Sequence, residues 1–363
     1  MKILLLLLLF INLLLLDAQA SCFTDLDFLV RNMLKAEMQF SGGAEFFGKN
    51  QKITFQYRRF SHDLQEMVIE TIDKINKDIE KSSSFIIPRE VSASCNFNCS
   101  NGALYYHHIF FEVDSFATNS SLNLIEKKAI IAHEYGHLLL NRAISGDFPE
   151  LFDIWKYGVE YRLFRYINDI PQAERVYLKR SELFKSFNLY PLYNSISELF
   201  ADSVAVVYFK EPNIFPSLLE KIELREAQRY ALPRTQSKEF LQQKLKYRSF
   251  DSSLGLDPLE GTRDIHQYFY IARQKLFPYL EKAFDDPKEK ERVLANIMLA
   301  SKDTLEHFYR KDLNSTAEFR NILEKINNLK YGEKLQPEDQ SKFNEIIYSF
   351  NEVFMNNFKV LIN

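Results

Sequence analysis

The chain has 363 residues and a formal net charge of −3 at pH 7, with a pI near 6.2. This balance provides no basic surface excess, so no nucleic-acid partner is expected. The sequence holds 32 phenylalanines and 19 tyrosines but only 10 glycines and 11 prolines. Such a composition is typical of packed helices with short connections and excludes a largely disordered or repetitive chain.

The N-terminus has the pattern of a secretory signal peptide. Lys2 provides a positive charge, residues 3–16 are almost entirely apolar, and Ala18 and Ala20 occupy the positions that signal peptidase reads. A membrane anchor is the alternative, but the apolar run is shorter than the ~20 residues that span a bilayer. We therefore predict a signal peptide over 1–20. The mature protein is then exported to the periplasm, the cell surface or the extracellular space, without a transmembrane span.

The cysteines leave two questions open. Cys95 and Cys99 lie in a polar segment and could form a small disulfide in an oxidising compartment, or remain free thiols. Cys22 follows the predicted cleavage point closely enough to be a possible lipid anchor. Gln19 argues against this modification, because lipoprotein signals usually carry leucine three residues before the cysteine.

Apolar periodicity predicts mixed structure in the first part of the chain and helices in the rest. The predicted helices are 23–40 and 62–79, and the predicted strands are 52–57, 84–94 and 103–113. Asn123 and Glu126 form a predicted capping box for a helix that reaches about Arg142. From Arg273 onward we expect three long helices, with breaks near Asn314 and Gly332.

These elements predict an α+β fold that is predominantly helical, with a small mixed sheet and a helical C-terminal region. The expected organisation after the signal peptide is one domain over 21–270 and a helical region over 271–363.

The segment His133-Glu134-Tyr135-Gly136-His137 is the strongest chemical signal in the chain. Two histidines four apart on a helix project from one face and can bind one metal ion. Glu134 between them can accept a proton from a metal-bound water. The motif also occurs by chance in proteins without a metal, so a third ligand is needed to support the interpretation.

Glu198 is the predicted third ligand. It lies with Asp202 in the stretch Ser195–Phe209, where these are the only charged residues and share one helix face. A charge on a buried helix is costly unless it is paired or metal-bound. Glu198 as ligand and Asp202 as acceptor for a histidine N–H explains both charges. Alternatively, Ser195 and Glu198 form a capping box at a helix start, which leaves Asp202 unexplained.

The two motifs together resemble the gluzincin metallopeptidases. The most similar pattern is the branch of CAAX-prenyl and heat-shock membrane endopeptidases, here without their transmembrane helices. The resemblance covers about 120–210 and implies a zincin-like metallopeptidase core. By this resemblance His133, His137 and Glu198 bind zinc, Glu134 is the general base, and Asp202 is the partner of the first histidine.

Two further elements are expected to serve the same reaction. The resemblance implies that a strand near Tyr105–Val113 holds an extended substrate by strand addition. On this strand, His107 and His108 are interpreted as surface or stacking residues. A peptidase also needs a donor for the oxyanion of the intermediate. His266 is the candidate, with Arg263, Tyr193 and Tyr208 as alternatives.

The sequence thus predicts a zinc-dependent endopeptidase that holds one zinc ion per chain and hydrolyses protein or peptide substrates with Glu134 as base. The alternative is an exported binding or scaffold protein that keeps the fold but is catalytically silent. An intact Glu134 argues against this alternative, because a scaffold does not need a base between two ligands.

Overall fold

The computed structural model describes residues 44–47, 52–56, 62–87, 90–95, 108–111, 122–147, 181–218, 246–251, 258–262, 264–329 and 333–362. The predicted signal peptide, the predicted helix 23–40, Cys22 and Cys99 lie outside these residues. Within the described ranges, no helix combines the length and the apolar character that crossing a membrane requires.

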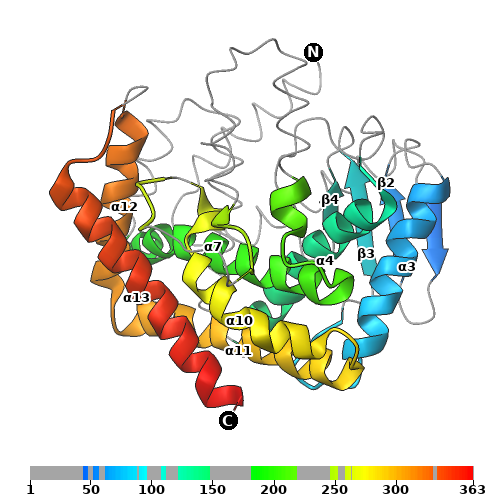
Figure 1. Ribbon diagram of the computed structural model, residues 1–363. Helices are drawn as coiled ribbons and strands as arrows, with labels where there is room; N and C mark the ends of the chain where they lie inside the picture. Colours follow the sequence, from blue (N-terminus) through cyan, green and yellow to red (C-terminus); the bar gives the residue numbers. More distant parts are fainter. Residues whose placement is uncertain are drawn as a thin grey trace, which may run out of the picture.

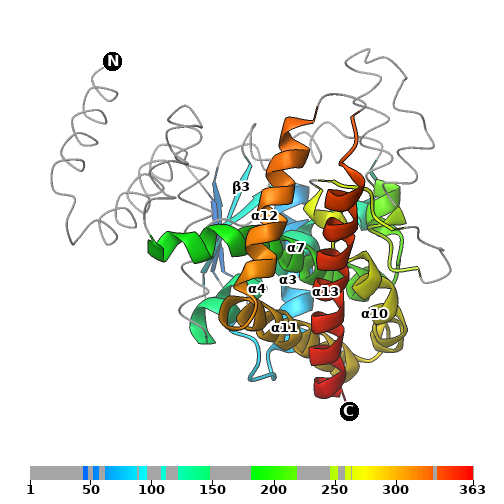
Figure 2. The same ribbon diagram turned by 90° about the vertical axis from the view of Figure 1, so that its left-hand side faces the viewer.

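Helices make up most of the described chain (Figure 1). In chain order they are α3 (His62–Ile79), α4 (Leu124–Asp147), α7 (Ser181–Phe209), the short 3-10 helix η2 (Ile265–Gln267), α10 (Tyr270–Ala283), α11 (Pro287–Arg310), α12 (Leu313–Asn328) and α13 (Pro337–Ile362). Helix α7 lies in the middle and packs against α4, α10, α11 and α12. Helix α13 packs against α10, α11 and α12, and the turned view shows it running beside α12 (Figure 2).

Four short segments pair as strands beside α3 and α4. They are β1 (Ala44–Phe47), β2 (Lys52–Gln56), β3 (Glu90–Cys95) and β4 (His108–Phe111), in the spatial order β1-β2-β3-β4. The pair β1–β2 is antiparallel and the other two pairs are parallel, with Ile53 opposite Val91. Strand β4 ends this order and contacts α4.

The predicted α+β class is nevertheless wrong. Helices make up most of the described residues, which makes the protein a mainly α-helical fold. Ile53 of β2 and Val91 of β3 belong to a core whose other described members lie mostly on helices. The sequence analysis predicted too many strand residues, because alternating apolar and polar residues also occur in segments that do not pair. Ser84 to Ile87 precede β3 without joining it, whereas the described part of 103–113, His108–Phe111, is strand throughout.

Several helix predictions are confirmed in detail. Helix α3 has the predicted bounds. Asn123 and Glu126 form the reciprocal capping box at the start of α4: the Asn123 N–H donates to Glu126 Oε2 at 2.8 Å, and the Glu126 N–H donates to Asn123 Oδ1 at 2.9 Å. The C-terminal part has one more break than expected, because Asp286 caps α11 and separates it from α10.

One hydrophobic cluster connects the N-terminal and C-terminal helices. It includes Ile72 on α3, Leu138 on α4, Phe200 on α7 and Phe350 on α13, none of which is more than 1% exposed. The cluster therefore extends across the predicted boundary at 270. That boundary stays a prediction.

Asn351 is a buried polar link within this cluster. Its Oδ1 accepts from the N–H of Ala272 in the first turn of α10 at 2.9 Å. Its Nδ2 donates to the carbonyls of Tyr268 at 2.8 Å and Ile347 at 2.7 Å. A side chain of α13 thus satisfies the start of α10, where helical N–H groups have no partner in the helix.

We predict that Asn351→Ala lowers the free energy of unfolding by about 2–4 kcal/mol, because two buried backbone groups lose their partner. Asn356→Ala, at an exposed position of the same helix, is the matched control and should change stability by less than about 0.5 kcal/mol. Denaturant unfolding monitored by circular dichroism measures both values. Equal midpoints for the two variants would contradict the assigned role of Asn351.

Candidate metal centre

The site forms where α4 and α7 come unusually close. Gly136 of α4 faces Ala201 of α7, and a Cβ on Gly136 would lie 2.8 Å from the Ala201 Cα. Only a residue without a side chain permits this approach. The flanking His133 and His137 are 6% and 7% exposed, and Glu198 on α7 is 8% exposed. The missing side chain thus allows buried groups from two helices to meet.

Three donor atoms converge at this contact. The Nε2 atoms of His133 and His137 are 3.0 Å apart. Glu198 Oε2 lies 3.4 Å from His133 Nε2, and Glu198 Oε1 lies 3.5 Å from His137 Nε2. Ligand atoms of a tetrahedral zinc ion with bonds of about 2.0–2.1 Å are about 3.3–3.4 Å apart. The observed spacings fit this arrangement, so the buried cluster of His133, His137 and Glu198 could hold a metal ion.

The outer nitrogen of each histidine faces a polar group on α7. His137 Nδ1 lies 2.7 Å from Ser197 Oγ. His133 Nδ1 lies 3.0 Å from Asp202 Oδ1. Contacts of this kind orient a ligating imidazole and leave Nε2 for the metal. Burial lowers the pKa of His137 to about 3, so this ring is neutral and its lone pair is free. Sequence reasoning missed Ser197, although it directly precedes Glu198.

The alternative interpretation of Glu198 as a capping residue is wrong. Ser195 lies inside α7, which begins at Ser181, and its hydroxyl donates to the Pro191 carbonyl at 2.8 Å. A serine hydroxyl that bonds to the carbonyl one turn earlier is typical of a helix interior. Glu198 is therefore also in a helix interior, where no free backbone N–H needs it.

Glu134 is adjacent to the cluster. Burial raises the pKa of its carboxyl to about 7, and His133 and Glu198 are among the charges that influence it. Its Oε2 atom is buried and has no hydrogen-bond partner. A buried carboxylate oxygen without a partner is costly, and such groups concentrate at functional sites. This is the group that the sequence predicted as general base.

Asp202 has two strong partners that the sequence reasoning missed. Arg248 binds it with both arms of its guanidinium, Nε to Oδ2 at 3.0 Å and Nη2 to Oδ1 at 2.7 Å. Arg273 of α10 donates from Nη2 to Oδ2 at 2.8 Å. Burial would raise the pKa of Asp202, but the two guanidiniums hold it well below its usual range. Asp202 is therefore a permanent anion.

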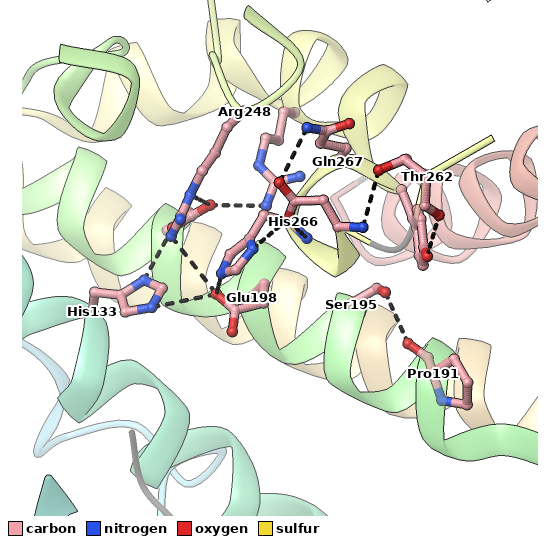
Figure 3. A network of polar contacts seen from close by, with 12 residues as sticks. His133, Pro191, Ser195, Glu198, Arg248, Thr262, His266 and Gln267 are labelled. Carbon is pink, nitrogen blue, oxygen red and sulfur yellow. Dashed lines mark hydrogen bonds and ion pairs between the residues drawn. The ribbon is translucent and has the colours of Figure 1, made fainter. Parts of the chain in front are cut away.

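His266 reaches the cluster from η2, as Figure 3 shows. Its Nε2 lies 3.1 Å from Glu198 Oε2 and its Nδ1 lies 2.6 Å from Asp264 Oδ1. Burial alone would lower the pKa of His266, but Glu198 and Asp264 raise it. The ring, whose side chain is 30% exposed, thus lies between two carboxylates beside the predicted metal ligands.

The segment before η2 is fixed by α13. The Gly261 N–H donates to Gln340 Oε1 at 2.8 Å, and Gln340 Nε2 donates to the Leu259 carbonyl at 2.9 Å. The Tyr268 hydroxyl closes the same turn by donating to the Thr262 carbonyl at 2.8 Å. His266 therefore stands on a backbone that α13 positions.

The other oxyanion candidates are less well placed. Tyr193 donates to Asn141 Oδ1, and Tyr208 donates to the Ile75 carbonyl at 3.3 Å, so both hydroxyls are engaged with other parts of the helical body. Arg263 and His107 lie outside the described residues.

Comparison with protein-family models, with curated proteins and with solved structures gives no match. The functional interpretation therefore depends on the geometry of the site, and the resemblance to gluzincins stays a prediction.

We predict that Gly136→Ala weakens metal binding at least ~10-fold, the range seen when the surroundings of a metal ligand are disturbed. Alanine normally stabilises a helix by about 1 kcal/mol relative to glycine, but here its Cβ would separate α4 from α7 and with them His137 from Glu198. The zinc affinity is measured by competition with a calibrated chelator, and circular dichroism reports helix content. A variant that is more stable than wild type and binds zinc equally well would show that the close contact does not position the ligands.

Proposed function

We propose that this chain is a zinc-dependent endopeptidase that hydrolyses protein or peptide substrates. The observation that supports it most is the convergence of three buried donors, His133, His137 and Glu198, next to the buried and unpartnered Oε2 of Glu134. A purely structural metal site has four protein ligands and no base beside it.

The donor set favours zinc. Two neutral imidazoles and one carboxylate are the ligands of catalytic zinc in several peptidases, and they leave one position for water or substrate. Within the described residues, the other cluster of potential ligands is His62, Asp63 and Glu66, which is exposed at the start of α3. Exposed acidic groups of this kind are common without a metal. The proposal is one zinc ion per chain.

Glu134 and His266 have complementary parts in the proposed reaction. A bound zinc ion would act as a Lewis acid and lower the pKa of a water molecule. Glu134 then accepts the proton of the attacking water and returns it to the leaving amine. In this proposal His266, held at Nδ1 by Asp264, turns its Nε2–H from Glu198 to the oxygen that becomes negative when the carbonyl is attacked.

Strand β4 is the proposed place for an extended substrate. It is the last strand in the spatial order and contacts α4, the helix that carries both histidines. The free backbone groups of an end strand can pair with a peptide, which gives main-chain recognition without strong sequence preference.

We predict that purified protein binds one equivalent of zinc and that His137→Ala loses most of it, because two donors cannot replace three. His62→Ala is the matched control and should retain the full equivalent, since it removes a histidine from the exposed cluster. Metal content after dialysis is measured by atomic absorption. Full zinc occupancy in His137→Ala would place the metal elsewhere.

We further predict that Glu134→Gln keeps the zinc equivalent and the fold but lowers peptide hydrolysis by roughly 1,000-fold, because an amide cannot act as a base. The assay is hydrolysis of a denatured, fluorescently labelled protein with and without a chelator. If wild type binds zinc at His137 but never hydrolyses any peptide, the chain is a silent relative of such enzymes and the proposal fails.

A further inference from the structure

Asp202 lies at the centre of a saturated set of contacts. It is completely buried, and each of its oxygens faces two nitrogen atoms. Oδ1 faces Arg248 Nη2 at 2.7 Å and His133 Nδ1 at 3.0 Å. Oδ2 faces Arg248 Nε at 3.0 Å and Arg273 Nη2 at 2.8 Å. A carboxylate offers about four acceptor positions, so none remains for water.

The two guanidiniums make this carboxylate possible at a buried position. An ionised carboxylate inside a protein is strongly destabilising unless it is paired and hydrogen-bonded. Arg273, which is completely buried, and Arg248 provide the compensating charge from outside the helix pair α4–α7, and Arg248 also lies 3.7 Å from Glu198 Oε2.

Each guanidinium is held independently. Arg248 stacks over the Phe215 ring at 4.5 Å, and its chain segment is attached where the Phe250 N–H donates to the Pro212 carbonyl at 3.1 Å. Arg273 belongs to α10, whose first turn is fixed by Asn351. Neither arginine contacts a metal ligand as closely as it contacts Asp202. Their influence on the site must therefore pass mainly through this carboxylate.

We propose that Arg248 and Arg273 are positioning residues for the metal centre, which act by holding the Asp202 carboxylate in place so that it orients His133. This inference rests on the proposed zinc site but not on peptidase activity. By this inference, Arg248 and Arg273 influence metal affinity through Asp202.

The test is a double-mutant cycle read by zinc affinity alone. Asp202→Asn should weaken zinc binding about 10–100-fold, as expected for loss of a group that orients a ligating histidine. Arg273→Met should weaken it about 10-fold in the wild-type background and less than about 2-fold in the Asp202→Asn background, because its effect passes through the carboxylate. The conservative variant Arg273→Lys should retain most of the wild-type zinc affinity, since it keeps the charge. Arg292→Met on α11, where the side chain is 49% exposed and pairs with Glu289, is the control and should have no effect.

The outcomes separate the two proposals. If His137→Ala retains its zinc, the site itself is wrong. If the site binds zinc but Arg273→Met weakens binding equally in both backgrounds, the arginine acts through the fold and not through Asp202, and the inference fails. An equal loss in Arg273→Lys and Arg273→Met would also contradict it.

A second set of variants covers the case in which Arg273→Met does not fold, because removal of one partner from a buried ion pair is strongly destabilising. The cycle is then run with Arg248→Lys, which keeps the charge but loses the bidentate geometry. This change should lower zinc affinity while Asp202 is present and should have little effect in the Asp202→Asn background. Equal losses in the two backgrounds would overturn the inference here as well.

Discussion

The contact between α4 and α7 at Gly136 and Ala201 is the constraint on which the site depends. Because α4 has no side chain at this point, the helix axes approach until His133 and His137 on one helix reach Glu198 on the other. A side chain at position 136 would move both His133 and His137 away from Glu198. The metal centre is therefore a property of a helix pair, and its precision depends on packing density there.

The charges around the ligands form a balanced set. Asp202 and Glu198 contribute two carboxylates, and Arg248 and Arg273 contribute two guanidiniums. The formal charges of these four groups sum to zero without a metal, and all four side chains are buried. A divalent cation entering the site thus meets ligands that are already ordered by fixed charges. Such preorganisation lowers the cost of assembling the site when the metal binds.

Local sequence patterns were sufficient for the parts of the site that lie on single helices. The spacing of His133 and His137 and the two charges on an apolar stretch, Glu198 and Asp202, identified the groups that the structure brings together. The capping box at Asn123 likewise depends on neighbours in sequence. These features were predictable because helix geometry alone determines which residues share a face.

The remaining features depend on tertiary contacts that leave no local pattern. Arg273 follows Tyr270 and Ala272 in an ordinary helical segment, and nothing in its neighbourhood indicates a partner on α7. The sequence analysis assigned Asp202 to a histidine N–H alone, and no local pattern shows that Arg248 and Arg273 also bind this carboxylate. The overestimate of strands has a similar cause, because alternation shows that a segment can be a strand, whereas pairing depends on segments far away in the chain.

The amides of Gln340 and Asn351 have a consequence for biosynthesis. Both belong to α13, the last helix described, yet they fix the backbone that carries His266 and the helix that carries Arg273. A chain emerging from the ribosome exposes the histidine motif long before these amides exist, since synthesis proceeds at about 5–20 residues per second. The surroundings of the candidate site are consequently completed only after α13 has been synthesised, some two hundred residues after the histidine motif.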